Sequence, residues 1–237
     1  MIELAALDMA GTTVNESGAV YRALRTAVER TGVPVTDEDL QTWMGTDKRE
    51  AIAALVRLGG GTPTSELVEE GYEAFAAFLR EAYAATPPQA IEGVEDALAE
   101  LRRRGIKVAL TTGFSADVAY PLLESLGWSA GEGGNLDAVV TSDEVPRGRP
   151  APHMIHRAME KTGVIDTRRV LTAGDTIVDV EAGTNAGAGI VVGVLTGELP
   201  RAAFAGHPHA RVLASAAELP TLPETLPATG PTALPTA

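Results

Sequence analysis

The chain contains no cysteine. Disulfide bonds, catalysis by a thiolate and cysteine-based metal sites are therefore excluded. The sequence also lacks a basic segment followed by a long apolar run at its start, so nothing indicates a signal peptide. No stretch approaches the roughly 20 apolar residues that a membrane-spanning helix needs. We therefore expect a cytoplasmic protein that has no membrane partner.

Positive charge is scarce as well. The chain has 19 lysine and arginine residues against 32 aspartate and glutamate residues, which gives a net charge of −13. This balance argues against binding to nucleic acid or to an anionic membrane surface, because both carry dense negative charge. A site for an anionic small molecule then has to supply positive charge locally, from a metal ion or from single basic side chains.

Short apolar runs alternate with helical patterns over most of the chain. Its 237 residues, 45% of them hydrophobic, suffice for one large α/β domain or for a core with a smaller second domain. After an apolar strand at 2–7, strand patterns recur at 106–110, 138–141, 168–173 and 189–194, with helical segments between them. Such β-α repeats imply an α/β fold with a Rossmann-like parallel sheet and helices on both faces.

Residues 15–89 interrupt this alternation with helical patterns only. We expect helices at 19–31, 37–44, 48–58 and 65–85. A helical insertion directly after the first strand suits a cap that closes over the sheet edge and excludes water. The predicted domains are a core of residues 1–14 and 90–215, a helical cap of residues 15–89, and a disordered tail of residues 216–237 that is rich in Pro, Thr, Leu and Ala without periodicity.

The stretch Ile2–Thr13, IELAALDMAGTT, places a carboxylate at the end of the first strand. A buried parallel strand delivers the residue at its end, here Asp8, to the sheet edge where α/β proteins bind ligands. Gly11 allows a tight turn in which N–H groups and the Thr12 hydroxyl can face an anion. Such an aspartate can attack phosphorus or ligate a metal. Taken alone, the stretch is better explained as a strand that ends in aspartate and turns at glycine.

A second site downstream changes this interpretation. The segment 169–179, RVLTAGDTIVD, is again an apolar strand, followed by Asp175 and, four residues later, Asp179. If a helix begins near Thr176, the two carboxylates lie one turn apart. Carboxylates from separate strand ends of one sheet can converge on a hard cation such as Mg²⁺, which prefers a few carboxylates and waters.

Two further candidates lie between these sites. Thr111-Thr112-Gly113 follows the strand at 106–110, and Arg149 precedes Pro150 and a helix. A hydroxyl and a fixed cation at strand ends are what a phosphoryl group needs for orientation and charge neutralisation. Arg147 is the alternative to Arg149 in the same polar loop.

Four such sites, in this order and each after a strand, resemble the haloacid dehalogenase superfamily of phosphotransferases. The resemblance covers the chain up to the tail. It implies an Mg²⁺-dependent enzyme in which Asp8 is the nucleophile, while Thr112 and Arg149 bind the phosphoryl oxygens. It also assigns Mg²⁺ to Asp8, the Ala10 carbonyl and Asp175, with Asp179 orienting the metal shell, and substrate contacts to Gly11, Thr12 and Gly113.

Ala10 departs from most of that superfamily. Its phosphatases carry a second aspartate two residues after the nucleophile, as the general acid for an alkoxide leaving group, and alanine cannot transfer a proton. The DxAGT form, with Arg149 where most members have lysine, resembles the phosphonatase branch, which cleaves a carbon–phosphorus bond. In that branch a cap lysine forms a Schiff base with the substrate aldehyde, and the imine accepts the electrons of the broken bond.

The segment WMGTDK at 43–48 is similar to the Met-Gly-x-x-Lys cap motif of the phosphonatases. The resemblance assigns the Schiff base to Lys48 and substrate contacts to Met44 and Gly45. A lysine at a helix start is usually solvated, and a reactive one has to lose its proton near neutral pH. The loss at Ala10 favours the reactive interpretation, because an imine removes the need to protonate an oxygen leaving group.

Ala51 departs from the phosphonatases, which place a histidine three residues after the lysine. The proton transfers then need another group or water. The leading hypothesis is hydrolysis of phosphonoacetaldehyde or a close carbonyl phosphonate. A phosphomonoester phosphatase is one alternative, against which Ala10 argues. A non-catalytic phospho-acceptor or binding module is another, against which the chain length and the helical insertion argue. The resemblance also suggests a homodimer through the cap.

Overall fold

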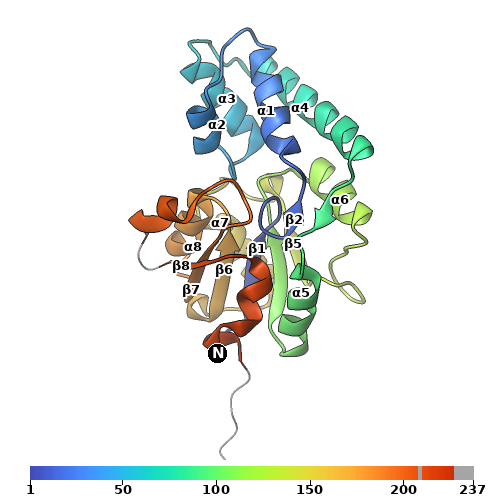
Figure 1. The fold of residues 1–237 in the computed structure, drawn as a ribbon, viewed down its shortest axis with the longest axis vertical. Helices are drawn as coiled ribbons and strands as arrows, with labels where there is room; N and C mark the ends of the chain where they lie inside the picture. Colours follow the sequence, from blue (N-terminus) through green and yellow to red (C-terminus); the bar gives the residue numbers. More distant parts are fainter. Residues whose placement is uncertain (208–209, 227–237) are drawn as a thin grey trace, which may run out of the picture.

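The computed structural model describes residues 1–207 and 210–226. Its core is a six-stranded parallel sheet with the strand order β5-β4-β1-β6-β7-β8 (Figure 1). The first strand lies in the middle, hydrogen-bonded to β4 on one side and to β6 on the other. The predicted α/β fold class is therefore confirmed. The strands are β1 (Leu4–Asp8), β4 (Lys107–Thr111), β5 (Ala138–Val140), β6 (Val170–Gly174), β7 (Ile190–Val194) and β8 (Arg211–Leu213).

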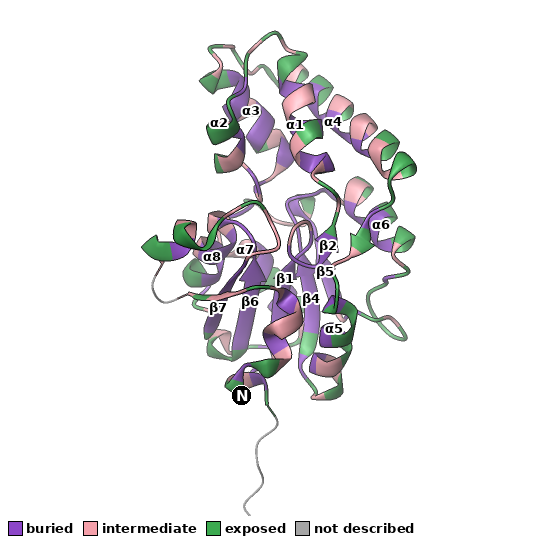
Figure 2. Cartoon of the chain, viewed as in Figure 1, coloured by how far each residue is buried: buried purple, intermediate pink, exposed green. Residues whose placement is uncertain are grey.

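Both faces of the sheet are covered by helices. All five residues of β1 are buried (Figure 2). Successive side chains enter different apolar clusters, because a strand alternates between faces. Ala5 and Leu7 belong to the cluster that contains α5 and α6, whereas Leu4 and Ala6 belong to the one that contains α7. These helices are α5 (Val94–Arg103), α6 (Ala116–Ser125), α7 (His153–Thr162) and, after β6, α8 (Ile177–Asn185). Short 3₁₀ helices are η1 (Ser142–Glu144), η2 (Thr167–Arg169) and η3 (Arg201–Gly206).

Four helices form an insertion over one end of the sheet (Figure 1). The chain leaves the core through β2 (Val14–Asn15) and returns through β3 (Gln89–Ala90), which pair antiparallel. We call the residues between them, 16–88, the helical insertion. Its helices are α1 (Ala19–Glu29), α2 (Asp37–Thr42), α3 (Lys48–Leu58) and α4 (Ser65–Ala85). Among the described residues, no helix is long and apolar enough to cross a membrane.

The loop between α2 and α3 is longer than the sequence pattern indicates. The helix α2 ends at Thr42, two residues before the predicted end, and Gly45 has φ +79°, a left-handed conformation that favours glycine. The helix α3 then begins after Asp47, whose side chain accepts a hydrogen bond from the Glu50 N–H. Residues 43–47 therefore form a loop between two helices, and we call it the 43–47 loop.

The prediction that residues from 216 onward are disordered is wrong for 216–226. These residues form the 3₁₀ helices η4 (Ala216–Thr221) and η5 (Pro223–Thr225), and η4 packs against α5. Leu219 and Leu222 are buried in the main apolar cluster, and buried Thr225 donates hydrogen bonds to the carbonyls of both leucines. A 3₁₀ helix has three residues per turn and does not show the 3.6-residue periodicity of an α-helix. The apolar pattern of the sequence therefore did not predict these helices. The rest of the predicted tail, 227–237, lies outside the described residues.

Candidate active site

The structure brings the predicted site residues from separate segments to the carboxyl edge of the sheet. Asp8 ends β1 and lies opposite Thr111 at the end of β4, while Asp175 directly follows β6. A cavity of about 100 Å³ lies between this edge and the helical insertion. Of the predicted residues, those lining it are Asp8, Ala10, Gly11, Met44, Gly45, Lys48, Thr112, Gly113 and Asp175, whereas Thr12, Arg149 and Asp179 are buried without lining it.

Arg149 connects the core carboxylates to the 43–47 loop. Its Nη1 atom lies 2.6 Å from Asp8 Oδ1 and 2.8 Å from Asp179 Oδ1, and donates to the Gly45 carbonyl at 3.2 Å. Its Nη2 atom donates to the carbonyl and the hydroxyl oxygen of Thr111, at 2.8 and 2.9 Å. The planar guanidinium presents several donors in a fixed fork, so one buried cation can meet both groups of acceptors at once.

Asp8, Asp175 and Asp179 each place a carboxylate oxygen within 4.8 Å of the others. Burial raises the pKa of Asp8 to about 6, while the Arg149 charge opposes this and the Asp179 charge adds to it. Burial also raises the pKa of Asp175 well above its usual range, and the Asp8 and Asp179 charges act in the same direction. A cation beside these groups would favour their ionised forms.

The donor set fits a small hard cation such as Mg²⁺. Arg149 pairs with two of the three buried carboxylates, Asp8 and Asp179, so negative charge is left over at Asp175. The turn after β1 is closed by hydrogen bonds to the carbonyls of Met9 and Val14. Ala10 lines the cavity, and its carbonyl takes no part in these hydrogen bonds. Carboxylate and carbonyl oxygens are the ligands that Mg²⁺ prefers. Asp8, Ala10 and Asp175 could therefore hold this ion, as predicted from the resemblance.

Two glycines leave space for the Asp175 carboxylate. A Cβ atom would lie 2.5 Å from Asp175 Oδ2 at Gly11 and 2.0 Å from it at Gly197, so neither position admits a side chain without a shift. The Thr12 hydroxyl donates to Asp175 Oδ1 at 3.1 Å, and the Thr196 hydroxyl donates to the Gly11 carbonyl at 2.6 Å. The predicted Gly11 and Thr12 thus act here by packing around and orienting an aspartate.

Lys48 is a buried lysine at the first position of α3. Its side chain lines the cavity, the residue is 3% exposed, and Nζ donates to the Thr46 carbonyl at 3.0 Å. Burial lowers the pKa of Lys48 to about 8, although the charges of Asp47 and Asp8 act in the opposite direction. An amine with this pKa is partly neutral near pH 7, so the structure gives Lys48 the environment that a nucleophilic lysine requires.

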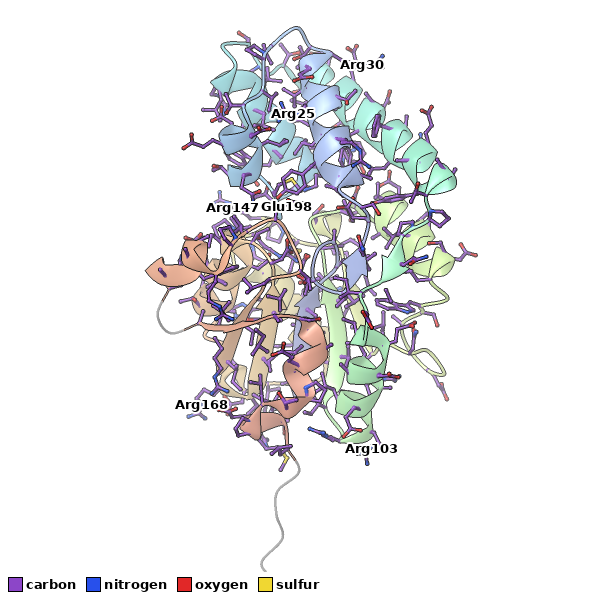
Figure 3. All side chains as sticks on the ribbon, in the orientation of Figure 1. Arg25, Arg30, Arg103, Arg147, Arg168 and Glu198 are labelled. Atoms are coloured by element: carbon purple, nitrogen blue, oxygen red, sulfur yellow. The ribbon has the colours of Figure 1, made fainter. Side chains whose placement is uncertain are left out.

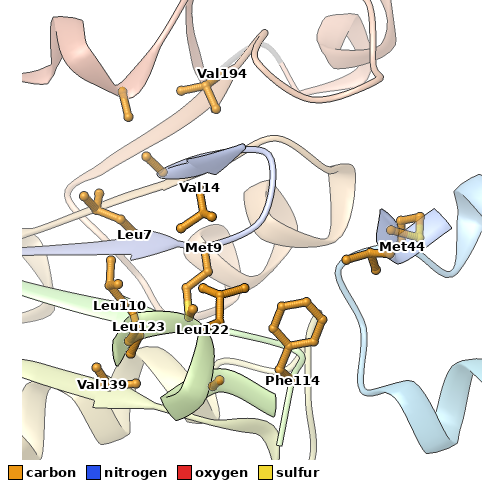
Figure 4. Packing of buried hydrophobic residues seen from close by; sticks show 14 of the residues in the cluster. Leu7, Met9, Val14, Met44, Leu110, Phe114, Leu122, Leu123, Val139 and Val194 are labelled. Atoms are coloured by element: carbon orange, nitrogen blue, oxygen red, sulfur yellow. The ribbon is translucent and has the colours of Figure 1, made fainter. Parts of the chain in front are cut away.

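The 43–47 loop touches the core at two glycines. A Cβ atom at Gly45 would lie 2.6 Å from Thr176 Oγ1, and one at Gly113 would lie 2.3 Å from the Thr46 carbonyl oxygen. Met44 and Phe114 belong to the same buried cluster, and Figure 4 shows Phe114 at the edge of the core packing. The contact between the backbones of Gly113 and Thr46 holds Lys48 beside the sheet edge.

Thr112 is a buried residue that lines the cavity. Its Oγ1 atom accepts a hydrogen bond from the Phe114 N–H at 3.1 Å, and its own N–H donates to the Val140 carbonyl. With the oxygen engaged as an acceptor, the hydroxyl hydrogen is available for an anionic ligand. The side chain therefore suits the phosphoryl contact that was predicted for it.

Several cavity residues were not predicted from the sequence. Thr196, Gly197 and Glu198 follow the strand β7, so the strand-end rule that identified Asp8 would have found them. Glu16 and Tyr21 come from the start of the helical insertion and carry no local signal. Figure 3 labels Glu198 and Arg147 at the junction of the helical insertion and the core. Arg147 is exposed, so the buried cation of the site is Arg149 and not this alternative.

Known proteins of similar sequence include two phosphonoacetaldehyde hydrolases. A phosphonoacetaldehyde hydrolase from Bacillus cereus (strain B4264) is 33% identical over 209 residues, which cover 83% of this chain and 76% of that protein. Another from Bacillus thuringiensis (strain Al Hakam) is 34% identical over 211 residues, with the same coverage. Both are relatives of this chain, and their names describe their own activity.

Solved structures share the fold. A hydrolase from Pseudomonas syringae superposes with a TM-score of 0.82 at 22% identity, covering 95% of this chain and 99% of that one, which is a likeness of fold alone. A phosphonoacetaldehyde hydrolase-like protein from Oleispira antarctica superposes with a TM-score of 0.76 at 25% identity, covering 93% and 90%. The family model of the haloacid dehalogenase-like hydrolases matches residues 2–187. The chain belongs to the haloacid dehalogenase-like hydrolase family and is a hydrolase.

Proposed function

We propose that this hydrolase cleaves the carbon–phosphorus bond of phosphonoacetaldehyde or of a close carbonyl phosphonate. The observation that carries the proposal is the position of Lys48, a buried amine with a lowered pKa in the same cavity as Asp8. Ala10 supports it, since the site has no acid at the position where phosphatases protonate an oxygen leaving group. The curated relatives named phosphonoacetaldehyde hydrolase support the same substrate class.

Asp8 and its neighbours handle the phosphoryl end of the substrate. Asp8 attacks phosphorus and forms an aspartyl-phosphate, which water then hydrolyses. Arg149 already holds Asp8 Oδ1, so it orients the nucleophile and neutralises charge on the phosphoryl oxygens, while the Thr112 hydroxyl donates to one of them. When Mg²⁺ is bound by Asp8, the Ala10 carbonyl and Asp175, with Asp179 orienting the metal shell, it supplies further positive charge for the same oxygens.

Lys48 handles the carbonyl end. Its neutral amine adds to the aldehyde carbon, and loss of water gives an iminium. When Asp8 takes the phosphoryl group, the electrons of the carbon–phosphorus bond move into the iminium and form an enamine. Protonation of the enamine carbon and hydrolysis then release the aldehyde and restore Lys48. The helical insertion acts as the cap that keeps bulk water from these steps. Cap-mediated dimerisation and a cytoplasmic location stay predictions.

The test is phosphate release from phosphonoacetaldehyde with Mg²⁺, for wild type beside Lys48→Arg. The chain has only three lysines, so Lys107→Arg, which changes an exposed lysine in β4, is a matched control. We expect release by wild type and by the control, and none by Lys48→Arg. Borohydride added during turnover should fix the substrate carbons on Lys48, visible as a mass increase of the peptide that contains it.

Two outcomes would contradict the proposal. Equal phosphate release by wild type and Lys48→Arg would exclude the imine. Fast hydrolysis of simple phosphate esters by wild type, with no action on carbonyl phosphonates, would instead favour a phosphomonoester phosphatase, despite Ala10.

A further inference from the structure

Three ionisable residues line the cavity without a part in the chemistry above: Glu16, Tyr21 and Glu198. Tyr21 is held by a hydrogen bond that its hydroxyl donates to Gln41 Oε1 at 2.6 Å, and burial raises its pKa above its usual range. Glu198 is exposed. Glu16 is partly buried and lies directly after β2, where the chain enters the helical insertion. Among these three, Glu16 is the carboxyl group that is sheltered from solvent.

The Glu16 side chain has a fixed position. Its Oε2 atom accepts a hydrogen bond from the Val20 N–H at 2.7 Å, in the first turn of α1. Burial raises the pKa of Glu16, although the backbone N–H groups of the helix start and the Arg22 charge act against this. The carboxyl group is thus anchored at the start of α1, and Glu16 and Lys48 line the same cavity.

We propose that Glu16 transfers the proton that imine formation on Lys48 requires. This inference rests on the proposed function, whose imine needs an acid to remove a hydroxyl group as water. The described residues that line the cavity include no histidine, and Ala51, one turn beyond Lys48 on α3, has no group that can transfer a proton. Asp8 and Asp175 already have roles at the phosphoryl end.

Glu16 acts when the carbinolamine on Lys48 loses water. The neutral Lys48 amine adds to the aldehyde carbon, and a proton moves from nitrogen to oxygen to give a neutral carbinolamine. The Glu16 carboxyl group then donates its proton to the hydroxyl, the carbon–oxygen bond breaks with its electrons leaving on water, and the nitrogen lone pair completes the C=N bond. The products are an iminium, water and a Glu16 carboxylate. In the final hydrolysis, water adds to the iminium carbon and Glu16 takes up the released proton.

Glu16→Gln separates this role from a purely structural one. The glutamine amide oxygen can still accept the Val20 N–H, so the start of α1 keeps its hydrogen bond, but the side chain no longer carries an acidic proton. Glu198→Gln removes another carboxylate from the cavity lining and is the matched control. Borohydride trapping of the Lys48 imine in the first turnover, quantified by intact mass, measures the step directly and does not depend on phosphate release.

We expect Glu16→Gln to slow imine formation at pH 7 by about 100-fold, the scale of general acid catalysis, with an unchanged midpoint of thermal unfolding. Glu198→Gln should stay close to wild type. The pH profile gives a second readout. In wild type the rate should fall above about pH 8, because the neutral fraction of Lys48 no longer increases there, while the protonated fraction of Glu16 keeps falling with pH. Glu16→Gln should lose that decline, since only Lys48 then titrates.

The charges around Lys48 and Glu16 affect the pH profile. Asp47, Asp8, Arg149 and Glu16 act on Lys48, and Arg22 acts on Glu16. The variants leave all of these in place except the one changed. Trapping by Glu16→Gln at the wild-type rate, with the decline above pH 8 retained, would overturn the role of Glu16 and leave the proposed function standing. No trapping in wild type or in either variant would overturn the proposed function and this role with it.

Discussion

Gly113 and Thr46 approach each other so closely that a Cβ atom on the glycine would lie 2.3 Å from the threonine carbonyl oxygen. Gly113 follows the strand β4 in the core, and Thr46 belongs to the 43–47 loop of the helical insertion. Two residues beyond Thr46, Lys48 donates a hydrogen bond to that same carbonyl. The distance between two backbones thus determines where the proposed Schiff-base lysine lies.

Gly113→Ala should therefore displace the 43–47 loop and reduce activity. The added methyl group has to move backbone atoms, because real Cβ contacts do not occur at this distance. We expect kcat to fall by at least about tenfold, as misplacement near 1 Å costs up to about 100-fold. Gly148→Ala is the matched control, since its Cβ would lie 3.5 Å from Asp47, an ordinary contact. Equal losses in both variants would contradict the argument.

Arg149→Lys should be a damaging change although it preserves the charge. One ammonium group cannot contact Asp8 and Asp179 and also bind both oxygens of Thr111, as the guanidinium does. We expect a loss of about 100-fold in kcat/KM. Arg147→Lys, in the exposed neighbouring position, should leave steady-state kinetics unchanged.

Arg149→Met should destabilise the protein in a pH-dependent way. It leaves Asp8, Asp175 and Asp179 buried without their cation, which costs about 3 to 5 kcal/mol of unfolding free energy. The pKa of Asp8 is already raised to about 6, and removing the Arg149 charge raises it further. Protonation relieves the repulsion, so the loss should be larger at pH 8 than at pH 5. Urea unfolding at both values, without divalent ions, measures it. An equal loss at both would exclude charge repulsion as the cause.

The sequence was most informative where a functional side chain lies at the end of a strand. Asp8 and Asp175 could be predicted because both directly follow or end buried parallel strands, whose ends meet at one edge. Lys48 was identified by its motif, but its burial depends on the Gly113–Thr46 contact, which joins segments more than 60 residues apart in the sequence. Leu219 and Leu222 escaped detection because 3₁₀ turns lack helical periodicity. Long-range packing, unlike strand ends, leaves no local pattern.

Magnesium should stabilise the protein through Asp175. An ion that binds only the folded state at 100 times its Kd adds about 2.7 kcal/mol to the unfolding free energy. We therefore expect Mg²⁺ to raise the midpoint of thermal unfolding of wild type and to have no such effect on Asp175→Asn, which removes one of the three buried carboxylates. Chelation should abolish phosphate release. Asp143→Asn, an exposed aspartate in η1, should keep the full response to Mg²⁺.

Tyr72→Phe should loosen the helical insertion from the core. The Tyr72 hydroxyl, on α4, donates to Asp117 Oδ1 at 2.9 Å and also contacts Ser115, both at the start of α6. Phenylalanine keeps the ring on which the Arg49 guanidinium is stacked at 3.6 Å. We expect a stability loss of about 1 kcal/mol, a higher KM and faster amide exchange in the 43–47 loop. Tyr120→Phe, in a mostly exposed position, should change none of these.

Lys48→Met should make the protein more stable near neutral pH. The pKa of Lys48 falls from 10.5 to about 8 on folding, because burial disfavours the ammonium form. Between these values the unfolded chain binds more protons than the folded one, so stability rises with pH through this window. Below pH 8 the full penalty applies, about 3 kcal/mol for this shift.

Methionine has a similar shape and no charge, but it leaves the Thr46 carbonyl without its hydrogen bond, which costs about 1 kcal/mol. We therefore expect Lys48→Met to gain about 2 kcal/mol at pH 7 and to lose this advantage near pH 10. Urea unfolding at the two pH values measures the difference, with Lys107→Met as the control for an exposed lysine. If the variant were less stable than wild type at pH 7, burial would not be disfavouring the ammonium form of Lys48. A higher free energy of unfolding for Lys48→Met would instead mean that the buried, reactive amine of Lys48 lowers the stability of the wild-type protein.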